Sequence, residues 1–334
     1  MYAHMPIIRD ILFGASKHGA NLATLCSKLE ISTVDLNDSE KRLDFEKAYQ
    51  VWEEAVQATG DTLLGLHLGE STTPAIMGLI GHLMQSSPNL KVAFERLCEY
   101  GRLATDMFAY SWEKQGENVV LKFQPAVVWM TVSEDSARQA VEQAMAGTLH
   151  VFELLTGRKI YPVLVQFEFS KPKDQREYDR VFQSTIQFGA DSNQLVVRGV
   201  DMNQPVIGYD VSLFSLFDEL IQERVNALMD KKNFSGVVTN LLLTEFKVQI
   251  PSVEIIASRL NMTPRTFQRK LLEEGTTYRK LSSAVRKELA LQLIKKSKHK
   301  TEEIAQMLGY SDASAFRRAF KQWTDGNPSE LRKN

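Results

Sequence analysis

The sequence predicts an α+β amino-terminal domain followed by an all-α domain with two helix-turn-helix units joined by a long linker helix. Three observations support this fold class. At 334 residues the chain is too long for one ordinary hydrophobic core. Strand-like alternation of apolar residues stops before about residue 211. A two-helix pattern then occurs twice within the last hundred residues.

In the amino-terminal part, helical and strand patterns interleave without a strict strand–helix–strand rhythm, which indicates an α+β domain. Apolar residues at helical intervals predict helices over 40–59, 76–86, 89–105, 134–156 and, more briefly, 178–183. Alternating residues on either side of Gly116 predict a hairpin of 107–112 with 119–123, and further strands are expected at 163–169 and 195–198. We place this domain at residues 1–210.

A connecting segment is expected at residues 211–233. Its apolar residues recur at helical spacing over 212–229, at Leu213, Phe217, Leu220, Ile221 and Leu228. This helix either forms a dimer interface or packs on its own domain, and the pattern fits both. The polar run 230–233 marks the domain boundary, after which Ser235 is expected to cap a helix through Leu243.

Residues 234–334 contain a duplicated unit. The motif Ile-Ala-x-x-Leu begins at Ile256 and again at Ile304, and each copy is followed by a second amphipathic helix. The copies predict one helix-turn-helix at 253–274, a linker helix at 277–296 and a second helix-turn-helix at 301–323.

Turn and cap residues support both units. Asn261 and Gly309 are suited to the left-handed conformation that the turn between the helices needs. Thr263, with Pro264 after it, and Asp312 are expected to cap the second helices. The side chains expected to point inward are Phe267, Leu271, Phe316, Phe320 and Trp323.

The opposite face of each second helix is basic and polar. On the second helix of the second helix-turn-helix, one face carries Ser314, Arg317, Arg318 and Lys321. On the second helix of the first helix-turn-helix, the matching face carries Arg265, Gln268 and Arg269, with Thr266 beside them. Arginine and glutamine are suited to guanine and adenine edges, and a helix-turn-helix places its second helix in the major groove. The alternative is a solvated charged face on a small helical bundle.

The charge distribution and the linker length agree with DNA binding. Residues 234–334 hold 18 Lys and Arg against 10 Asp and Glu, a net charge of +8, whereas the rest of the chain has a net charge of −9. A helix of about 20 residues spans roughly 30 Å, which is close to the ~34 Å turn of B-DNA. One subunit is therefore expected to read two successive major grooves.

The last hundred residues resemble the DNA-binding domain of the AraC/XylS family of bacterial transcription regulators, including the closing stretch from Ala319 to Trp323 and from Pro328 to Arg332. The resemblance implies base-edge contacts by Arg265, Gln268, Arg269, Ser314 and Arg318. It implies phosphate contacts by Thr266, Arg317 and Lys321, and a contact of Ala313 with a base or a thymine methyl group.

The first two hundred residues resemble the arabinose-binding-type sensor domain of one branch of that family. The matching stretches run from Gly78 to Ser87 and, more loosely, from Phe167 to Pro205. The resemblance implies a small-molecule effector, a homodimer and double-stranded promoter or operator DNA as partners, with RNA polymerase as a further candidate. Tyr110, Trp112, Phe123 and Trp129 either line an effector pocket or fill the core, so no effector residue is named.

The alternative function is a constitutive DNA-binding regulator whose first domain only oligomerises. The effector, the target sequence and the choice between activation and repression stay open. We expect no enzyme, because no catalytic constellation stands out, and no cofactor. We expect no metal site, because Cys26, Cys98 and the six histidines lack ligand spacing. No run of apolar residues is long enough to span a membrane, and the expected location is the bacterial cytoplasm, at the nucleoid.

Overall fold

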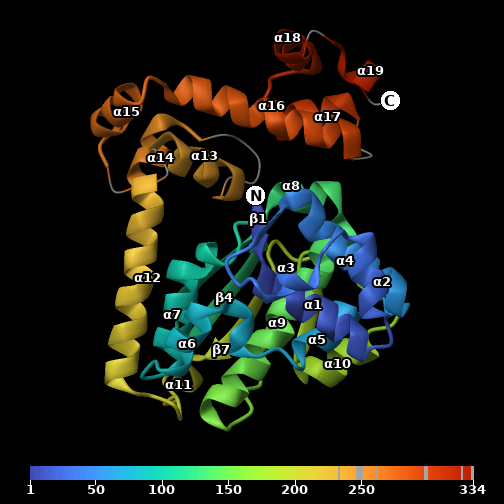
Figure 1. Ribbon diagram of the computed structural model, residues 1–334, viewed down its shortest axis with the longest axis vertical. Coiled ribbons are helices and arrows are strands. Elements are labelled where there is room, and N and C mark those ends of the chain that lie inside the picture. Colours follow the sequence, from blue (N-terminus) through green and yellow to red (C-terminus); the bar gives the residue numbers. More distant parts are fainter. Residues whose placement is uncertain (232–233, 246–250, 261, 297–299, 325, 332–334) are drawn as a thin grey trace. The chain divides into compact units, whose positions relative to one another are not determined.

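The computed structural model describes residues 1–231, 234–245, 251–260, 262–296, 300–324 and 326–331 (Figure 1). The chain divides into two compact units, one of residues 1–125 with 135–224 and one of residues 126–134 with 225–334. The first unit combines helices with a sheet and the second is helical. The predicted fold class, an α+β domain followed by a helix-turn-helix region, is confirmed.

The first unit contains a five-stranded sheet in the order β3-β4-β7-β5-β6. Neighbouring strands are antiparallel except for the parallel pair β5 and β6. The predicted hairpin is present and turns at Gly116, where φ is 62°. The strands are β3 (Phe108–Gln115), β4 (Asn118–Pro125), β5 (Leu164–Phe167), β6 (Thr185–Phe188) and β7 (Gln194–Arg198).

The predicted helix at 134–156 is α9 (Glu134–Thr156), and several other segments depart from their patterns. Residues 42–44 form strand β2, paired with β1, so the helix predicted at 40–59 begins only at Phe45, capped by Asp44. Gly78, at φ 56°, separates a 3-10 turn from α6 within 76–86. The elements are β1 (Tyr2–His4), α1 (Met5–Lys17), α2 (Leu22–Lys28), α3 (Thr33–Asn37), β2 (Arg42–Asp44), α4 (Phe45–Thr59), α5 (Leu64–Gly69), η1 (Pro74–Met77), α6 (Leu79–Gln85), α7 (Leu90–Tyr100), η2 (Gly101–Leu103), α10 (Arg176–Phe182) and α11 (Gly199–Met202).

Helix α5 lies directly against α9 because glycines remove the side chains between them. A Cβ atom on Gly65 would lie 2.1 Å from the carbonyl oxygen of Gln139, and one on Gly69 would lie 2.5 Å from the Cβ of Ala146. The side chain of Gln139 accepts a hydrogen bond from the Gly65 N–H at 2.6 Å. It also donates one to the Thr62 carbonyl at 2.8 Å. The chain around α5 is thus fixed to the longest helix of the unit.

Two of the aromatic side chains considered for an effector pocket pack on one another in the core. Phe123 is fully buried, and its ring contacts those of Phe94 and Tyr110 at centroid separations of 6.2 and 6.0 Å. Burial raises the pKa of Tyr110 above its ordinary range. Phe123 therefore belongs to the hydrophobic core, and the half-buried Tyr110 packs against it.

The connecting helix α12 (Val211–Lys231) is longer than predicted. Asp230 and Lys231 belong to it instead of forming a break, while residues 232 and 233 and the side chain of Leu228 lie outside the described structure. Ile221 is fully buried, whereas Leu213 is 45% and Leu220 39% exposed. The predicted apolar face is therefore only partly covered within this chain.

The second unit consists of two small cores that share one helix. The first core contains Val238, Leu241, Leu242, Ile256, Ala257, Phe267, Leu271 and Val285, and the second contains Ala290, Leu293, Ile294, Ile304, Ala305, Leu308, Phe316 and Phe320. Leu289 packs against both. The helices are α8 (Val127–Val132), α13 (Phe234–Glu245), α14 (Val253–Arg259), α15 (Pro264–Glu273), α16 (Tyr278–Lys296), α17 (Thr301–Met307), α18 (Ala313–Thr324) and α19 (Pro328–Leu331).

Candidate DNA-binding interface

The first helix-turn-helix consists of α14 and α15. Thr263 caps α15, because its hydroxyl accepts a hydrogen bond from the Thr266 N–H at 3.2 Å, and Pro264 occupies the first turn. Phe267 and Leu271 are fully buried on the inner face of α15, as expected. Asn261, the predicted turn residue, lies outside the described residues.

The second helix-turn-helix consists of α17 and α18. Gly309 adopts φ 77° in the turn between them, which a side chain would strain. The carboxylate of Asp312 caps α18 by accepting a hydrogen bond from the Ala315 N–H at 2.8 Å. That bond lowers the pKa of Asp312, so the cap stays charged. Phe316 and Phe320 are fully buried, and Trp323 is half-buried against the same core.

The polar residues predicted to contact DNA lie on the outer faces of α15 and α18. Arg265, Gln268 and Arg269 are exposed on α15, with Thr266 half-buried beside them. Ser314, Arg317, Arg318 and Lys321 are exposed on α18, with Ala313 half-buried in its first turn. Each helix therefore has one apolar face in its core and one polar, basic face in solvent.

Two of these arginines pair with carboxylates of their own helix-turn-helix. Arg317 donates a hydrogen bond to Glu302 of α17 at 3.0 Å. Arg269 lies 3.5 Å from Glu273, one turn further along α15. All four side chains are more than half exposed, and such surface pairs contribute only ~0–1 kcal/mol. Either arginine can therefore exchange its partner for another acceptor at small cost.

Helix α16 joins the two helix-turn-helix units and contributes residues to the cores of both (Figure 1). At its start, the Tyr278 hydroxyl donates a hydrogen bond to the Pro251 carbonyl at 2.6 Å. Further along, Arg286 donates to the Leu308 carbonyl at 3.2 Å, and Ser283 accepts from the Trp323 indole at 3.3 Å. These bonds fix each helix-turn-helix to one rod.

Several positioning residues were not anticipated from the sequence. Ser235 does not cap α13 but lies in its first turn, and the carboxylate of Glu274 accepts the N–H groups of Phe234 and Ser235 instead. Arg286 bonds the end of α17 from α16. No local pattern marks these residues, because each partner lies 22 or more positions away.

The first unit contains an open cavity of about 410 Å³ between α9, α10 and the segment at 159–161. Its lining mixes apolar side chains with Glu70, Glu153 and Lys159. Cavities that bind small molecules fall in this range of volume.

Within the described residues, no helix combines the length and apolar character needed to cross a membrane.

Comparison with known proteins gives two family matches. Residues 19–206 match the model of the arabinose-binding domain of AraC transcription regulators, and residues 256–334 match a helix-turn-helix domain model.

Full-length relatives are regulators as well. The chain is 27% identical to the ornithine utilization regulator of Pseudomonas aeruginosa, over 95% of this chain and 92% of that protein. It is 25% identical to the transcriptional regulator VqsM of the same organism, over 80% of this chain and 83% of the relative. Among solved structures, the transcriptional regulator CdpR from Pseudomonas aeruginosa is 22% identical, with 93% of this chain and 96% of that chain covered and a TM-score of 0.45.

The two family models fall on the two kinds of structure described above, and the matched relatives are DNA-binding regulators, not enzymes. The chain belongs to the AraC family of helix-turn-helix transcription regulators, in the branch with an arabinose-binding-type amino-terminal domain.

Proposed function

We propose that α15 and α18 enter two successive major grooves on one face of the DNA and read sequence there. The observation that carries this proposal is the pairing of a buried aromatic face with an exposed basic face on both helices. Base edges are read mainly from the amino-terminal half of a recognition helix, and phosphate contacts fix the register and orientation of the protein on the duplex.

The proposed contacts follow from side-chain chemistry. Arginine, glutamine and serine can hydrogen-bond to base edges, and arginine, lysine and threonine can contact phosphate oxygens. We assign base-edge contacts to Arg265, Gln268, Arg269, Ser314 and Arg318. We assign phosphate contacts to Thr266, Arg317 and Lys321, and a contact with a thymine methyl group to Ala313.

The spacing of the two reading helices supports contact with two grooves. Helix α16 has 19 residues and therefore a length of about 28 Å, close to one ~34 Å turn of B-DNA. Because both cores pack on α16, neither helix-turn-helix is free to drift along it.

The test begins with selection of preferred duplexes from a random library, followed by footprinting. We expect two protected stretches about one helical turn apart for each subunit. Arg269→Ala should relax sequence preference in one stretch and Arg318→Ala in the other. Arg176→Ala, on the surface of the first unit, is the matched control and should change neither. Protection of one stretch only would overturn the two-groove arrangement.

We further propose that a small polar effector binds the first unit, in the cavity beside α9 and α10. The cavity offers both signs of charge, from Glu153 and Lys159, together with apolar walls. A ligand alters DNA binding only if it has unequal affinity for the two states of the protein. A thermal-shift screen of metabolites, repeated with Glu153→Gln and Lys159→Gln, tests the site. A stabilising compound unaffected by both variants would place the effector elsewhere.

The second candidate function is constitutive DNA binding by an oligomer. The exposed side chains of Leu213, Leu216 and Leu220 on α12 favour a homodimer, because clustered apolar side chains on a surface mark interfaces. A Leu216→Lys variant should shift the mass in solution from dimer to monomer, with Val34→Lys, an exposed apolar residue on α3, as the control. Dimers with the same operator affinity across the whole metabolite screen would favour this function.

A further inference from the structure

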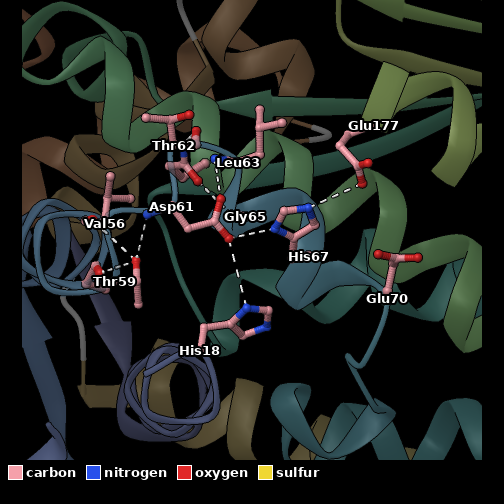
Figure 2. A network of polar contacts seen from close by, with 12 residues as sticks. His18, Val56, Thr59, Asp61, Thr62, Leu63, Gly65, His67, Glu70 and Glu177 are labelled. Atoms are coloured by element: carbon pink, nitrogen blue, oxygen red, sulfur yellow. Dashed lines mark hydrogen bonds and ion pairs between the residues drawn. The ribbon is translucent and has the colours of Figure 1, made fainter. Parts of the chain in front are cut away.

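Four polar side chains from four separate segments converge in the first unit (Figure 2). His18 ends α1, Asp61 lies in the turn between α4 and α5, His67 lies on α5, and Glu177 lies at the start of α10. His18, Asp61 and His67 each offer one metal-ligating atom, and these three atoms lie within 4.8 Å of one another.

The three side chains present their ligand atoms to a common point. The Nδ1 atom of His67 lies 2.6 Å from Oδ2 of Asp61, and the Nδ1 atom of His18 lies 3.9 Å from the same oxygen. The two imidazole rings are nearly parallel, with centroids 5.9 Å apart. One carboxylate oxygen thus faces both imidazole nitrogens.

The backbone beneath these side chains is held in place. Gly65 and Gly69, on either side of His67, press α5 against α9. Gly14 lets the end of α1, which carries His18, approach Leu68 of α5, since a Cβ atom there would lie 2.4 Å from that side chain. The scaffold therefore fixes the positions from which both histidines reach Asp61.

Asp61 is oriented by its own turn. Its Oδ1 atom accepts a hydrogen bond from the Leu63 N–H at 2.9 Å, which directs Oδ2 toward the histidines. Helix α4 ends just before it, at Gly60 with φ 69°. Asp61 is only 22% and His67 23% exposed in their side chains, so the group is partly shielded but open to solvent on the side of His18.

We propose that His18, Asp61 and His67 bind one divalent transition-metal ion of the zinc type. Two imidazole nitrogens and one carboxylate oxygen are a donor set that suits Zn²⁺, which binds such atoms at about 2.0–2.2 Å in tetrahedral geometry. Tetrahedral ligands at that range lie about 3.3 Å from one another, between the 2.6 and 3.9 Å separations found here. Side-chain adjustments of about 1 Å bring the three atoms onto one ion, and water takes the fourth position.

Glu177 has the place of an outer-shell partner. Its Oε2 atom lies 3.5 Å from Nε2 of His67, the nitrogen that points away from Asp61. Metal-bound histidines commonly donate their second N–H to a carboxylate, which fixes the ring and its tautomer. Arg180 donates to Glu177 at 2.7 Å and also binds Glu70, so this carboxylate is itself held.

The site is tested with the full-length protein, stripped of metal by a chelator and titrated with Zn²⁺ in a calorimeter. The two cysteines are replaced by serine in all samples, because free thiols also bind zinc. We expect one ion per chain, a rise in melting temperature on adding Zn²⁺, and a tetrahedral spectrum with Co²⁺. Ligand variants His18→Gln, His67→Gln and Asp61→Asn should weaken binding by more than ~100-fold, and Glu177→Gln by ~10–100-fold.

The controls separate this site from adventitious binding. His82→Gln, an exposed histidine on α6, should leave Zn²⁺ affinity unchanged. His18 is at an exposed helix end and Asn at position 61 keeps an acceptor for Leu63, so these variants should fold; circular dichroism checks this. Absence of Zn²⁺ binding by the parent protein, or equal affinity in the His18, Asp61 and His82 variants, would overturn the proposal.

Discussion

The carboxylate of Glu274 accepts a hydrogen bond from the backbone N–H of Ser235 at 2.8 Å, across 39 positions of the chain. It also accepts the N–H of Phe234. Glu274, which directly follows the proposed recognition helix α15, thereby caps α13, a helix that shares its core. The start of α13 and the end of α15 are tied together by one side chain.

Removal of this cap should loosen α13. Glu274→Ala leaves two backbone N–H groups without their acceptor, at an expected cost of ~1 kcal/mol, typical of helix caps. Native-state hydrogen exchange of the α13 amides measures it. Glu273→Ala, which removes only an exposed pair with Arg269, is the control and should change the exchange little.

The same cap should weaken in acid. Slight desolvation raises the pKa of the exposed Glu274, but the hydrogen bonds from Ser235 and Phe234 outweigh it and leave the pKa below its ordinary value of 4.5. The stabilisation is present above the unfolded-state pKa and is lost as the pH falls through the folded-state value. After correction for the intrinsic exchange rate, which itself falls in acid, the protection of the α13 amides should therefore drop below about pH 4.5 in the parent protein but not in Glu274→Ala; equal acid responses would contradict the cap.

A buried carboxyl should give the opposite pH dependence in the first unit. Burial raises the pKa of Asp10 to about 6, although a hydrogen bond from Gln143 at 2.9 Å opposes the change. The contribution of Asp10 to stability is therefore greatest below the unfolded-state value near 3.8 and is lost as the pH rises through about 6. Asp10→Asn should raise the free energy of unfolding at neutral pH by roughly 1–3 kcal/mol and flatten that dependence. Denaturant titrations at several pH values test this, with the exposed Asp191→Asn as control.

Arg318→Ala should affect sequence preference more than affinity for DNA in general. The loss of a bidentate base contact should cost ~1–3 kcal/mol on the preferred duplex and little on random duplex. Competition binding with both duplexes measures the difference. An equal loss on the two would reassign Arg318 to phosphate contact.

Lys321→Ala should weaken binding to all duplexes alike. A lost phosphate contact releases one counterion fewer, so the slope of log affinity against log salt should fall by about one. Titrations at several salt concentrations give this slope. An unchanged slope would place Lys321 outside the DNA interface.

The second domain was largely predictable because its determinants are local. Ile256 and Ile304 head identical motifs, and caps at Thr263 and Asp312 lie within three residues of the N–H groups that they accept. Periodicity then placed Phe267 and Phe316 inside and Arg269 and Arg318 outside.

The first domain was harder because tertiary contacts override its local patterns. Residues 42–44 lie in a segment with helical spacing, yet they form a strand because β1 pairs with them. Strand β6 (Thr185–Phe188) was missed, since its alternating residues are only partly covered. The strand predicted at 163–169 is shorter in the structure: β5 spans Leu164–Phe167, and Val163 precedes it and is exposed.

The histidine cluster could not be predicted from spacing. His18 and Asp61 are 43 positions apart and share no motif. They meet because Gly14 and Gly65 allow α1, α5 and α9 to approach closely. A glycine in a sequence does not by itself predict such packing. The expectation of no metal site rested only on the spacing of cysteines and histidines along the sequence, and spacing does not reveal ligands that come from distant segments.

The two cores wrapped around α16 restrict how this domain can change its length. Inserting one residue between Val285 and Leu293 would turn everything after it by about 100° and push it about 1.5 Å along the axis. Leu289 would then leave one core or the other, and the basic face of α18 would turn by the same angle relative to that of α15. Evolved variants that still fold should therefore keep the length of α16 or change it by three or four residues at once. We expect changes in DNA preference to come from substitutions on α15 and α18.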